Sequence, residues 1–321
     1  MKTTFKALAL SAIAALSAAG AASATECIAP ANPGGGWDFT CRQIGRILQE
    51  IGVTPNLVQV TNMAGAGGGV AYSAVVADRN EDADLIVAAS SATTTRLAQN
   101  AYAGATADQV RWVGAIGGDP GVIVVAKDSP YQSINDLIEA VKADPASVSF
   151  AGGSAVGGFD HLKVLMLLNR AGFTDAKSVK YIGLDGGADA ITQTVGGFTQ
   201  AMTGDLSEVG GFLKSGDVRA LAVLSDARVT GFDDIPTAKE QGVDLVAMNW
   251  RGIYVPKGIS DDDYNKWVDA LNKVAASDQW KQVMTENGLA PYTLTGTDFE
   301  TFVGENIAEI TNISKEIGII Q

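Results

Sequence analysis

Residues 27–41 read CIAPANPGGGWDFTC, and this stretch predicts a strand, a tight turn and a helix in direct succession. Glu26 to Ala31 has the character of a short strand. Beyond the turn, apolar residues recur with helical spacing on one face, at Ile44, Ile47, Leu48 and Ile51. The same succession of strand, turn and helix is repeated along the chain, so this first unit sets the expected fold class.

The turn contains Gly34, Gly35 and Gly36, which let the backbone approach a partner closely and expose its N–H groups. Asp38 is expected to be the N-cap of the following helix. Free amides and the positive end of a helix dipole bind anions without any charged side chain. The turn therefore predicts an anion site or, taken alone, a tight strand–helix connection without a ligand.

Cys27 and Cys41 flank this turn and are the only cysteines in the chain. In an oxidising compartment they are expected to form a disulfide. Closing a loop of roughly 15 residues adds about 3 kcal/mol of stability in the chain-entropy model. The bond would also hold the turn in place against strand and helix, whereas the alternative is a pair of buried free thiols.

Residues 1–24 have the features of a secretory signal peptide. Lys2 and Lys6 precede an apolar run from Ala7 to Ala19, and Ala22-Ser23-Ala24 is a cleavage signal. The run is too short to span a membrane, and no later stretch is long and uncharged enough. We therefore expect a soluble protein exported to a bacterial periplasm.

The composition is acidic, with a formal net charge of −13. Such a charge disfavours nucleic acid and anionic membranes as partners, but not a small anion held by helix N-termini. Charged residues make up 18% and hydrophobic residues 46% of the chain, which indicates a globular protein with a large core. Because 321 residues exceed what one core usually supports, two lobes are expected.

Strand and helix patterns alternate along the chain, which predicts an α/β fold with mostly parallel sheets. Two separate strands are expected at Val110–Ile116 and Val122–Ala126. Ligands of such sheets bind beyond the carboxyl ends of the strands. The turns at those ends share glycine, serine and threonine, at Gly34–Asp38, Gly65–Gly69, Ser90–Thr95, Gly152–Gly158 and Gly186–Ala188.

Known catalytic and nucleotide-binding motifs are incomplete in this sequence. Gly65-x-Gly67 lacks the third glycine of a dinucleotide fingerprint, and no P-loop Gly-Lys-Ser/Thr occurs. Gly152-x-Ser154 lacks the last glycine of a nucleophile elbow, and the single histidine, His161, is the one base available. One histidine and a disulfide leave no zinc site, so no cofactor or metal is expected.

Several segments together resemble one known family, the receptors of tripartite tricarboxylate transporters (the TctC/Bug solute-binding proteins). The resemblance covers the mature chain in order, through Cys27–Arg42, Asn62–Gly68, Gly152–Ser154 with Asp160–His161, Tyr181–Gly183, Gly187–Ala190, Arg219–Val223 and Ile235–Gly242. It implies a type II-like periplasmic-binding-protein fold, with two lobes joined by two crossing strands around a ligand cleft. The crossings are expected near Gly121–Lys127 and Asp244–Trp250. Residues 25–125 and 249–321 would then form lobe one, and residues 126–248 lobe two.

The resemblance also implies which residues hold the ligand. The expected contacts come from the glycine turns of lobe one, the serines and threonine after its third strand, and three residues of lobe two. They are Gly34, Gly35, Gly36, Trp37, Asp38, Gly65, Ala66, Gly67, Gly68, Ser90, Ser91, Thr93, Gly153, Ser154 and Asp205. Trp37 is expected either to stack on the ligand or to seal the loop, and His161 to be a packed or capping residue. Arg251 is the favoured ion-pair partner across the cleft, with Arg42 and Arg96 as alternatives.

The function implied is that of a monomeric periplasmic receptor, not an enzyme. It would capture a carboxylate, with a tricarboxylate such as citrate expected first, and deliver it to a large and a small membrane permease subunit. Three alternatives stay open. The first is a receptor of the same fold for a dicarboxylate, an amino acid or an aromatic acid. The second is a periplasmic ligand sensor, and the third is a secreted hydrolase with Ser154 as nucleophile.

Overall fold

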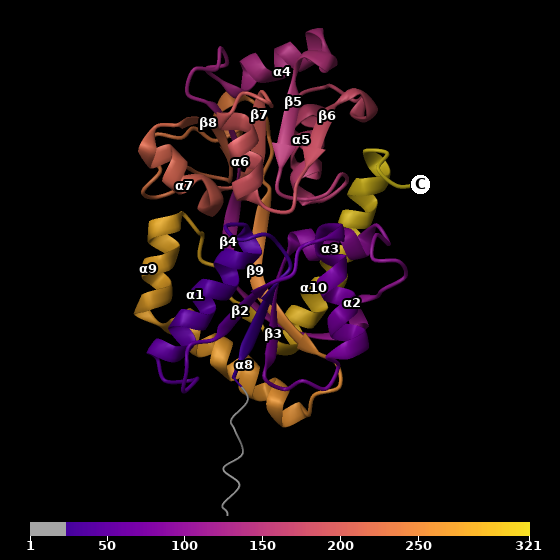
Figure 1. The fold of residues 1–321 in the computed structure, drawn as a ribbon. Helices are drawn as coiled ribbons and strands as arrows, with labels where there is room; N and C mark the ends of the chain where they lie inside the picture. Colours follow the sequence, from indigo (N-terminus) through magenta and orange to yellow (C-terminus); the bar gives the residue numbers. More distant parts are fainter. Residues whose placement is uncertain (1–23) are drawn as a thin grey trace, which may run out of the picture.

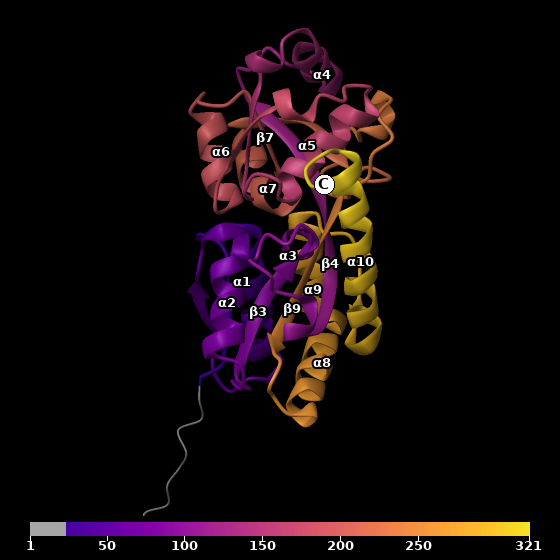
Figure 2. The ribbon, with the colours of Figure 1, turned by 90° about the vertical axis from the view of Figure 1, so that its right-hand side faces the viewer.

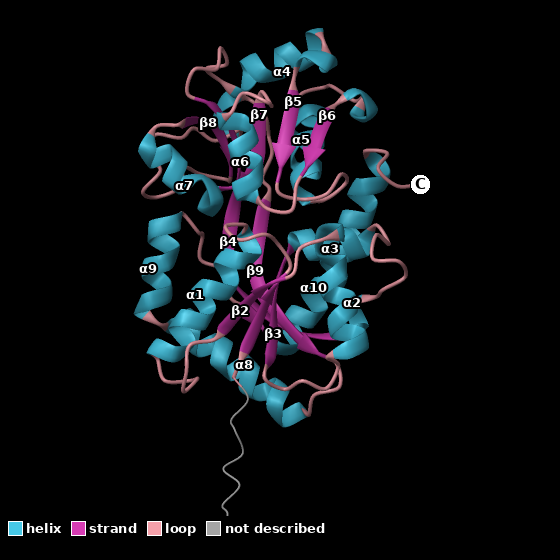
Figure 3. Ribbon diagram, in the orientation of Figure 1, coloured by secondary structure: helices cyan, strands magenta, loops and turns pink. Residues whose placement is uncertain are grey.

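A computed structural model describes residues 24–321, so the signal peptide expected at residues 1–24 lies outside the described residues except for Ala24. The described chain forms two α/β lobes, stacked one above the other in Figure 1. A single path of paired strands runs through both lobes in the order β2-β1-β3-β9-β4-β7-β5-β6, with β8 and β10 pairing on β4. The ribbon coloured by secondary structure shows helices flanking the strands in each lobe (Figure 3).

Lobe one, as named here, is built on β1, β2, β3, β9 and the first part of β4. Strand β1 pairs in parallel with β2 and β3, whereas β9 is antiparallel to both β3 and β4. Its elements are β1 (Glu26–Ala29), α1 (Gly36–Glu50), β2 (Gln59–Asn62), α2 (Gly69–Asp78), β3 (Leu85–Ser90), α3 (Ser91–Ala98), β9 (Met248–Pro256), α8 (Asp261–Ala276), α9 (Asp278–Asn287), β10 (Leu294–Thr295) and α10 (Gly296–Glu316).

Lobe two is built on β5, β6, β7, β8 and the second part of β4. Strand β5 is parallel to β6 and β7, and β4 is antiparallel to β7 and β8. The sheets are therefore mixed rather than mostly parallel, because the crossing strands run against their neighbours. Its elements are α4 (Ile134–Ala143), β5 (Ser149–Gly152), α5 (Phe159–Arg170), β6 (Lys180–Gly183), α6 (Gly187–Val195), β7 (Ala201–Asp205), α7 (Leu206–Ser215) and β8 (Val218–Leu224).

Strand β4 (Val110–Ala126) is continuous over 17 residues, so the prediction of two separate strands here was wrong. The glycines and proline of residues 117–121 suggested a turn, but these residues are extended and paired. Along β4 the partner changes from β9 at Pro120 to β7 and β8 at Gly121. From this change of partner we propose that the lobes divide at Pro120–Gly121 on β4 and beside Met248 on β9.

Each sheet is buried on both faces by helices. In lobe one, α1, α8 and α9 pack on one face, and α2, α3 and α10 on the other. In lobe two, α4 and α5 cover one face, and α6 and α7 the other. Covered on both sides, the strand ends at the lobe boundary are where polar loops can gather.

Helix α10 extends past the lobe boundary. Phe299 and Val303 near its start lie in the core of lobe one. Its far end reaches α5 of lobe two (Figure 2). There Glu316 and Ile317 line a hollow with Leu165 and Asn169 of α5. The C-terminal helix therefore touches both lobes.

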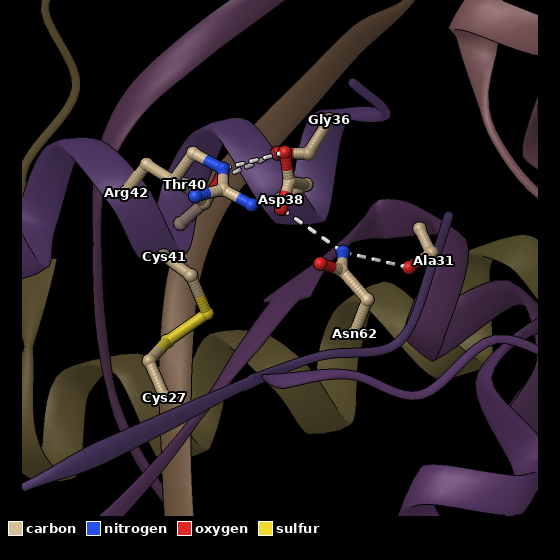
Figure 4. Close-up of a disulfide and its surroundings, with 8 residues drawn as sticks. All are labelled: Cys27, Ala31, Gly36, Asp38, Thr40, Cys41, Arg42 and Asn62. Carbon is tan, nitrogen blue, oxygen red and sulfur yellow. Dashed lines mark hydrogen bonds and ion pairs between the residues drawn. A yellow bond between two sulfur atoms is a disulfide. The ribbon is translucent and has the colours of Figure 1, made fainter. Parts of the chain in front are cut away.

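The Cys27–Cys41 disulfide is confirmed, and it joins β1 to the first turns of α1 (Figure 4). Helix α1 begins at Gly36 with Gly35 as N-cap, so the prediction that Asp38 is the N-cap was wrong. Asp38 lies inside the first turn instead, where its carboxylate accepts the Gly34 N–H at 2.9 Å and the Asn62 amide at 2.9 Å. The glycine turn is thus held by a disulfide at its base and a carboxylate at its tip.

Candidate functional site

The lobes face each other across a small cavity of about 30 Å³ at the point where β9 crosses. Helices α1 and α3 of lobe one and α5, α6 and α7 of lobe two all begin near it, so several positive helix ends converge. Its lining comes from Ala31, Gly36, Trp37, Ser90, Ala92, Gly153, Ser154, Asp160, Gly186, Asp205, Glu208, Asn249 and Arg251.

The lobes touch directly beside this cavity. The Asn32 backbone N–H donates to Asp185 O at 2.7 Å, and the Asn32 side-chain amide donates to Asp189 at 2.8 Å. The Gly36 N–H donates to Glu208 Oε1 at 2.8 Å. These bonds run from the first turn of lobe one to α6 and α7 of lobe two, so the structure is a closed form.

Glycine is required where backbones meet at the cavity. A Cβ on Gly35 would lie 3.2 Å from Gly186 Cα across the lobe boundary, and one on Gly153 only 2.5 Å from Gly187 N. A Cβ on Gly36 would clash with the Arg251 guanidinium. The glycine-rich turns thus allow close approach both between the lobes and within them.

Arg251 is the central cation of the site and is 2% exposed. Its Nη2 lies 2.6 Å from Asp119 Oδ2 on β4 and 2.9 Å from Asp205 Oδ2 at the start of α7. The ion pair across the cleft that the sequence suggested for Arg251 is therefore present, and it is made with Asp205. Arg42 instead pairs with Asp38 within α1, at 2.9 Å.

Lys163 is a second fully buried cation, on α5. Its Nζ lies 2.8 Å from Asp160 and 2.7 Å from Asp205, and it donates to Gly204 O at 2.7 Å. Burial alone would raise the pKa of Asp205, but Lys163 and Arg251 outweigh it and hold that pKa below its usual value. Asp205 is therefore ionised and fully occupied by protein cations.

Glu208 is the acidic side chain at the cavity that contacts no cation among residues 24–321. Its carboxyl group accepts two backbone amides, those of Gly36 and Asp205, the latter at 3.1 Å. Burial and the nearby Asp205 carboxylate raise its pKa to about 8, against the opposing effect of Arg251. The Glu208 carboxyl group, with its pKa of about 8, thus titrates near neutral pH.

The expected site residues divide into two sets. Six of them line the cavity: Gly36, Trp37, Ser90, Gly153, Ser154 and Asp205. The others lie outside its lining, at Gly34, Gly35, Asp38, Gly65, Ala66, Gly67, Gly68, Ser91 and Thr93. Among these, Gly34 and Gly35 face α6, and Gly67 and Gly68 lie against Arg96 and Tyr102.

Trp37 both seals the loop and borders the cavity. It is 9% exposed, and its indole N–H donates to Ser90 Oγ at 3.0 Å. Ser90 Oγ also accepts the Ala92 N–H at 3.2 Å and so caps α3. These two side chains fix the lobe-one wall of the cavity.

Ser154 lacks the surroundings of a nucleophile. Its Oγ accepts the Asp160 N–H at 3.0 Å and caps the start of α5, beside Tyr181. His161 Nδ1 accepts the Gly157 N–H at 3.0 Å, and the ring stacks on Tyr181 at 4.4 Å. The histidine is therefore a packed residue that positions a loop, as the sequence favoured, and it does not activate Ser154.

Several residues of the site were missed from the sequence, namely Asp119, Asp160, Lys163, Glu208 and Asn249. The sequence could have indicated Glu208, because Asp205 and Glu208 have the spacing of a capping box and form one at the start of α7. Asn249 and Arg251 are two apart on a strand and so share a face. Asp160 lies three residues before Lys163, but the second partner, Asp205, is 42 residues away in the chain, so the sequence did not indicate that Lys163 is buried.

Within residues 24–321, no cluster of histidine, cysteine and acidic side chains is arranged to hold a metal ion. Among the same residues no helix combines the length and apolar character of a membrane span.

Two α/β lobes joined by crossing strands, with helix starts meeting at a cavity lined by polar residues, define the fold of a solute-binding protein of the periplasmic-binding-protein type. Known structures share this fold. R. palustris Rpa4515 with adipate aligns with a TM-score of 0.83 at 22% identity, over 92% of this chain and 97% of that one. MatC (Rpa3494) from Rhodopseudomonas palustris with bound malate aligns with a TM-score of 0.79 at 18% identity, over 90% and 98%.

Sequence comparison gives the family. The family model described as tripartite tricarboxylate transporter family receptor (TctC) matches residues 41–319, and the chain belongs to this family. Protein BugT of Bordetella pertussis is 28% identical over 295 residues, which are 91% of this chain and 88% of BugT. The family and fold expected from the sequence are confirmed, and members of this family are binding receptors rather than enzymes.

Proposed function

We propose that this chain is a periplasmic receptor that captures a small carboxylate between its lobes and delivers it to the large and small membrane subunits of a tripartite tricarboxylate transporter. One observation carries the proposal: helix N-termini from both lobes converge on one small cavity lined by polar residues at the crossing strands. Helix N-termini bind carboxylates through unpaired amides and the helix dipole. Two proteins of this fold, MatC and Rpa4515, are described with malate and with adipate, and both of these compounds are carboxylates.

The charges in the cleft bear on which carboxylate is bound. The expected tricarboxylate would bring up to three negative charges to a region where four carboxyl groups surround two cations. Those groups belong to Asp119, Asp160, Asp205, Glu208, Lys163 and Arg251. Because both cations are already paired, a mono- or dicarboxylate suits this charge balance better than citrate does.

Binding can be tested by thermal shift on refolded, ligand-stripped protein. The series is citrate, isocitrate, tricarballylate, succinate, malate, glutamate and aromatic acids, with calorimetry on each hit. A ligand at 100 times its Kd adds about 2.7 kcal/mol of stability, which is several degrees in melting temperature. A flat response to every carboxylate would refute the proposal.

A second test of the proposed function obstructs the closure of the two lobes. A leucine at Gly35 is free of backbone strain, since the residue is extended, but it would be driven into Gly186 of lobe two. We expect Gly35→Leu to weaken binding of the hit at least tenfold. The matched control is Gly304→Leu on α10, where a Cβ meets nothing within 4 Å and affinity should be unchanged.

A further inference from the structure

A second, much larger hollow of about 650 Å³ lies beside the crossing strands, and it is here called the rear hollow. Both lobes contribute to its walls. Lobe two provides the loop 225–230 after β8, and lobe one provides the end of α9 and the residues that follow it. Most of the lining is apolar, from Pro120, Val229, Val246, Met248, Met284 and Leu289.

The rear hollow and the ligand cavity lie on opposite faces of the crossing strands. Successive side chains of a strand point to opposite faces. On β9, Asn249 and Arg251 line the cavity, whereas Met248 lines the rear hollow. On β4, Asp119 bonds Arg251, and the next residue, Pro120, lines the rear hollow. The strands at which the lobes are proposed to divide therefore separate the two spaces.

A packed contact between the lobes lies between the same two spaces. Gly288 is the C-cap of α9 and lines the rear hollow. A Cβ on this residue would lie 2.6 Å from Leu206 and 3.0 Å from Phe232, both of lobe two. Leu206 directly follows Asp205, which lines the cavity. Lobes that rotate about such a contact separate on one side of it and approach on the other, so opening of the cleft narrows the rear hollow.

Narrowing of the rear hollow brings apolar walls together. The cations at its rim already have partners, since Arg228 Nε lies 3.0 Å from Glu240 and Lys281 Nζ lies 2.9 Å from Asp278. Apolar surfaces that approach each other release water and gain free energy. The walls of the rear hollow therefore stabilise the open form of the receptor.

We propose that the rear hollow sets how readily the receptor closes, and that its lining thereby controls ligand affinity without touching the ligand. This inference rests on the proposed capture of a carboxylate between the lobes. The apparent affinity of a receptor falls with the fraction of free molecules in the binding-competent form. A side chain that fills the rear hollow obstructs opening, so it raises that fraction and the affinity.

Bulky substitutions on either wall test the proposal. Thr285→Phe on α9 and Ala227→Phe in lobe two each add a ring to the lining, and each should lower Kd at least threefold. The matched control is Thr301→Phe on α10. Thr285 and Thr301 are both exposed, and each hydroxyl donates to the carbonyl four residues earlier at 3.0 Å, but Thr301 is outside the lining. The control should bind like the parent chain in calorimetry.

Two further measurements distinguish a shift in closure from a change in the ligand site. Because neither ring touches the ligand, the affinity for every carboxylate that binds should rise by the same factor. Small-angle X-ray scattering of the ligand-free chains should give a smaller radius of gyration for both variants than for the parent and Thr301→Phe. Circular dichroism checks that each variant is folded, and the two substitutions lie on separate elements.

The outcomes separate this proposal from the proposed function. If both folded variants bind like Thr301→Phe or more weakly, the control of closure by the rear hollow is refuted. Gains that differ from one carboxylate to another would also refute it, because they would place the effect in the ligand site. If the parent chain binds no carboxylate, the proposed function fails, and the scattering of the ligand-free variants still decides whether the rear hollow controls closure.

Discussion

Replacing Arg251 by methionine tests whether the buried ion pairs at the crossing hold the lobes in place. The change keeps most of the side-chain volume but removes the charge that faces Asp119 and Asp205. Asp119 is fully buried and would keep only Ser207, whose N–H and hydroxyl both donate to it. Removing one partner of a buried ion pair costs about 3–5 kcal/mol, because the other charge is left uncompensated.

The expected shift in melting temperature follows from that cost. At about 2 °C per kcal/mol for a chain of this length, Arg251→Met should melt roughly 6–10 °C below the parent chain near neutral pH. The control is Arg46→Met, which breaks an exposed pair with Glu50 in α1. Such a pair is worth less than about 1 kcal/mol, so the control should melt within about 2 °C of the parent.

The loss of stability in the Arg251→Met variant should depend on pH. Burial already raises the pKa of Asp119 against the lowering effect of Arg251, and loss of Arg251 raises that pKa further. The folded variant then holds a proton that the unfolded chain releases, so its stability falls as pH rises through the folded-state pKa. The deficit should be larger at about pH 7.5 than at about pH 5.

Calorimetry and circular dichroism melts of Arg251→Met, Asp119→Asn and the double variant complete the test. The double variant should recover much of the loss, because a neutral amide at position 119 no longer needs a cation. A drop below about 2 °C, equal at both pH values and without rescue, would show that the ion pair contributes little to stability.

Three further predictions concern other parts of the chain. Reducing the Cys27–Cys41 disulfide should remove about 3 kcal/mol of stability, seen as a lower melting temperature in dithiothreitol than in buffer. Burial lowers the pKa of His161 to about 4, and its Nδ1 already accepts the Gly157 N–H, so the unfolded chain takes up a proton first as pH falls. The free energy of unfolding should therefore decline as the pH falls from about 6.5 to about 4. Urea titrations of the His161→Gln variant should show a smaller decline over the same pH range. Ser154→Ala should remove the hydroxyl that accepts the Asp160 N–H at the start of α5, which should lower the free energy of unfolding by about 1 kcal/mol. A variant that melts at the same temperature as the parent chain would contradict the capping role of Ser154.

The parts of the fold that could be predicted are those fixed by local chemistry. The first strand, the glycine turn and helix α1 follow from residues that lie together in the chain, and so does the disulfide. Ser133 caps α4 as a pattern of Ser and Asp three residues apart indicated. In each case the stabilising partner is only a few residues away.

The parts that could not be predicted depend on distant partners. The glycines and proline of residues 117–121 suggest a turn by themselves, and only pairing with β9 on one side and β7 and β8 on the other keeps β4 extended. Lys163 stands among apolar residues of α5, where a lysine would be placed facing solvent. It is fully buried because Asp160 and Asp205 neutralise it, and the second of these comes from another strand.

The closed form is held by hydrogen bonds between the lobes in addition to the Arg251–Asp205 ion pair, which bears on how the receptor responds to its ligand. Direct hydrogen bonds join Asn32 to α6, Gly36 to Glu208, and Gln99 to Gly157 at 2.7 Å. Each such bond contributes only about 1 kcal/mol net, and opening would let water replace it. The Gly36 amide is also satisfied by Glu208, which is costly to keep charged in the cleft. A ligand that contacts both lobes at once can therefore shift the balance between open and closed forms, because the open form would lose the contacts to one lobe.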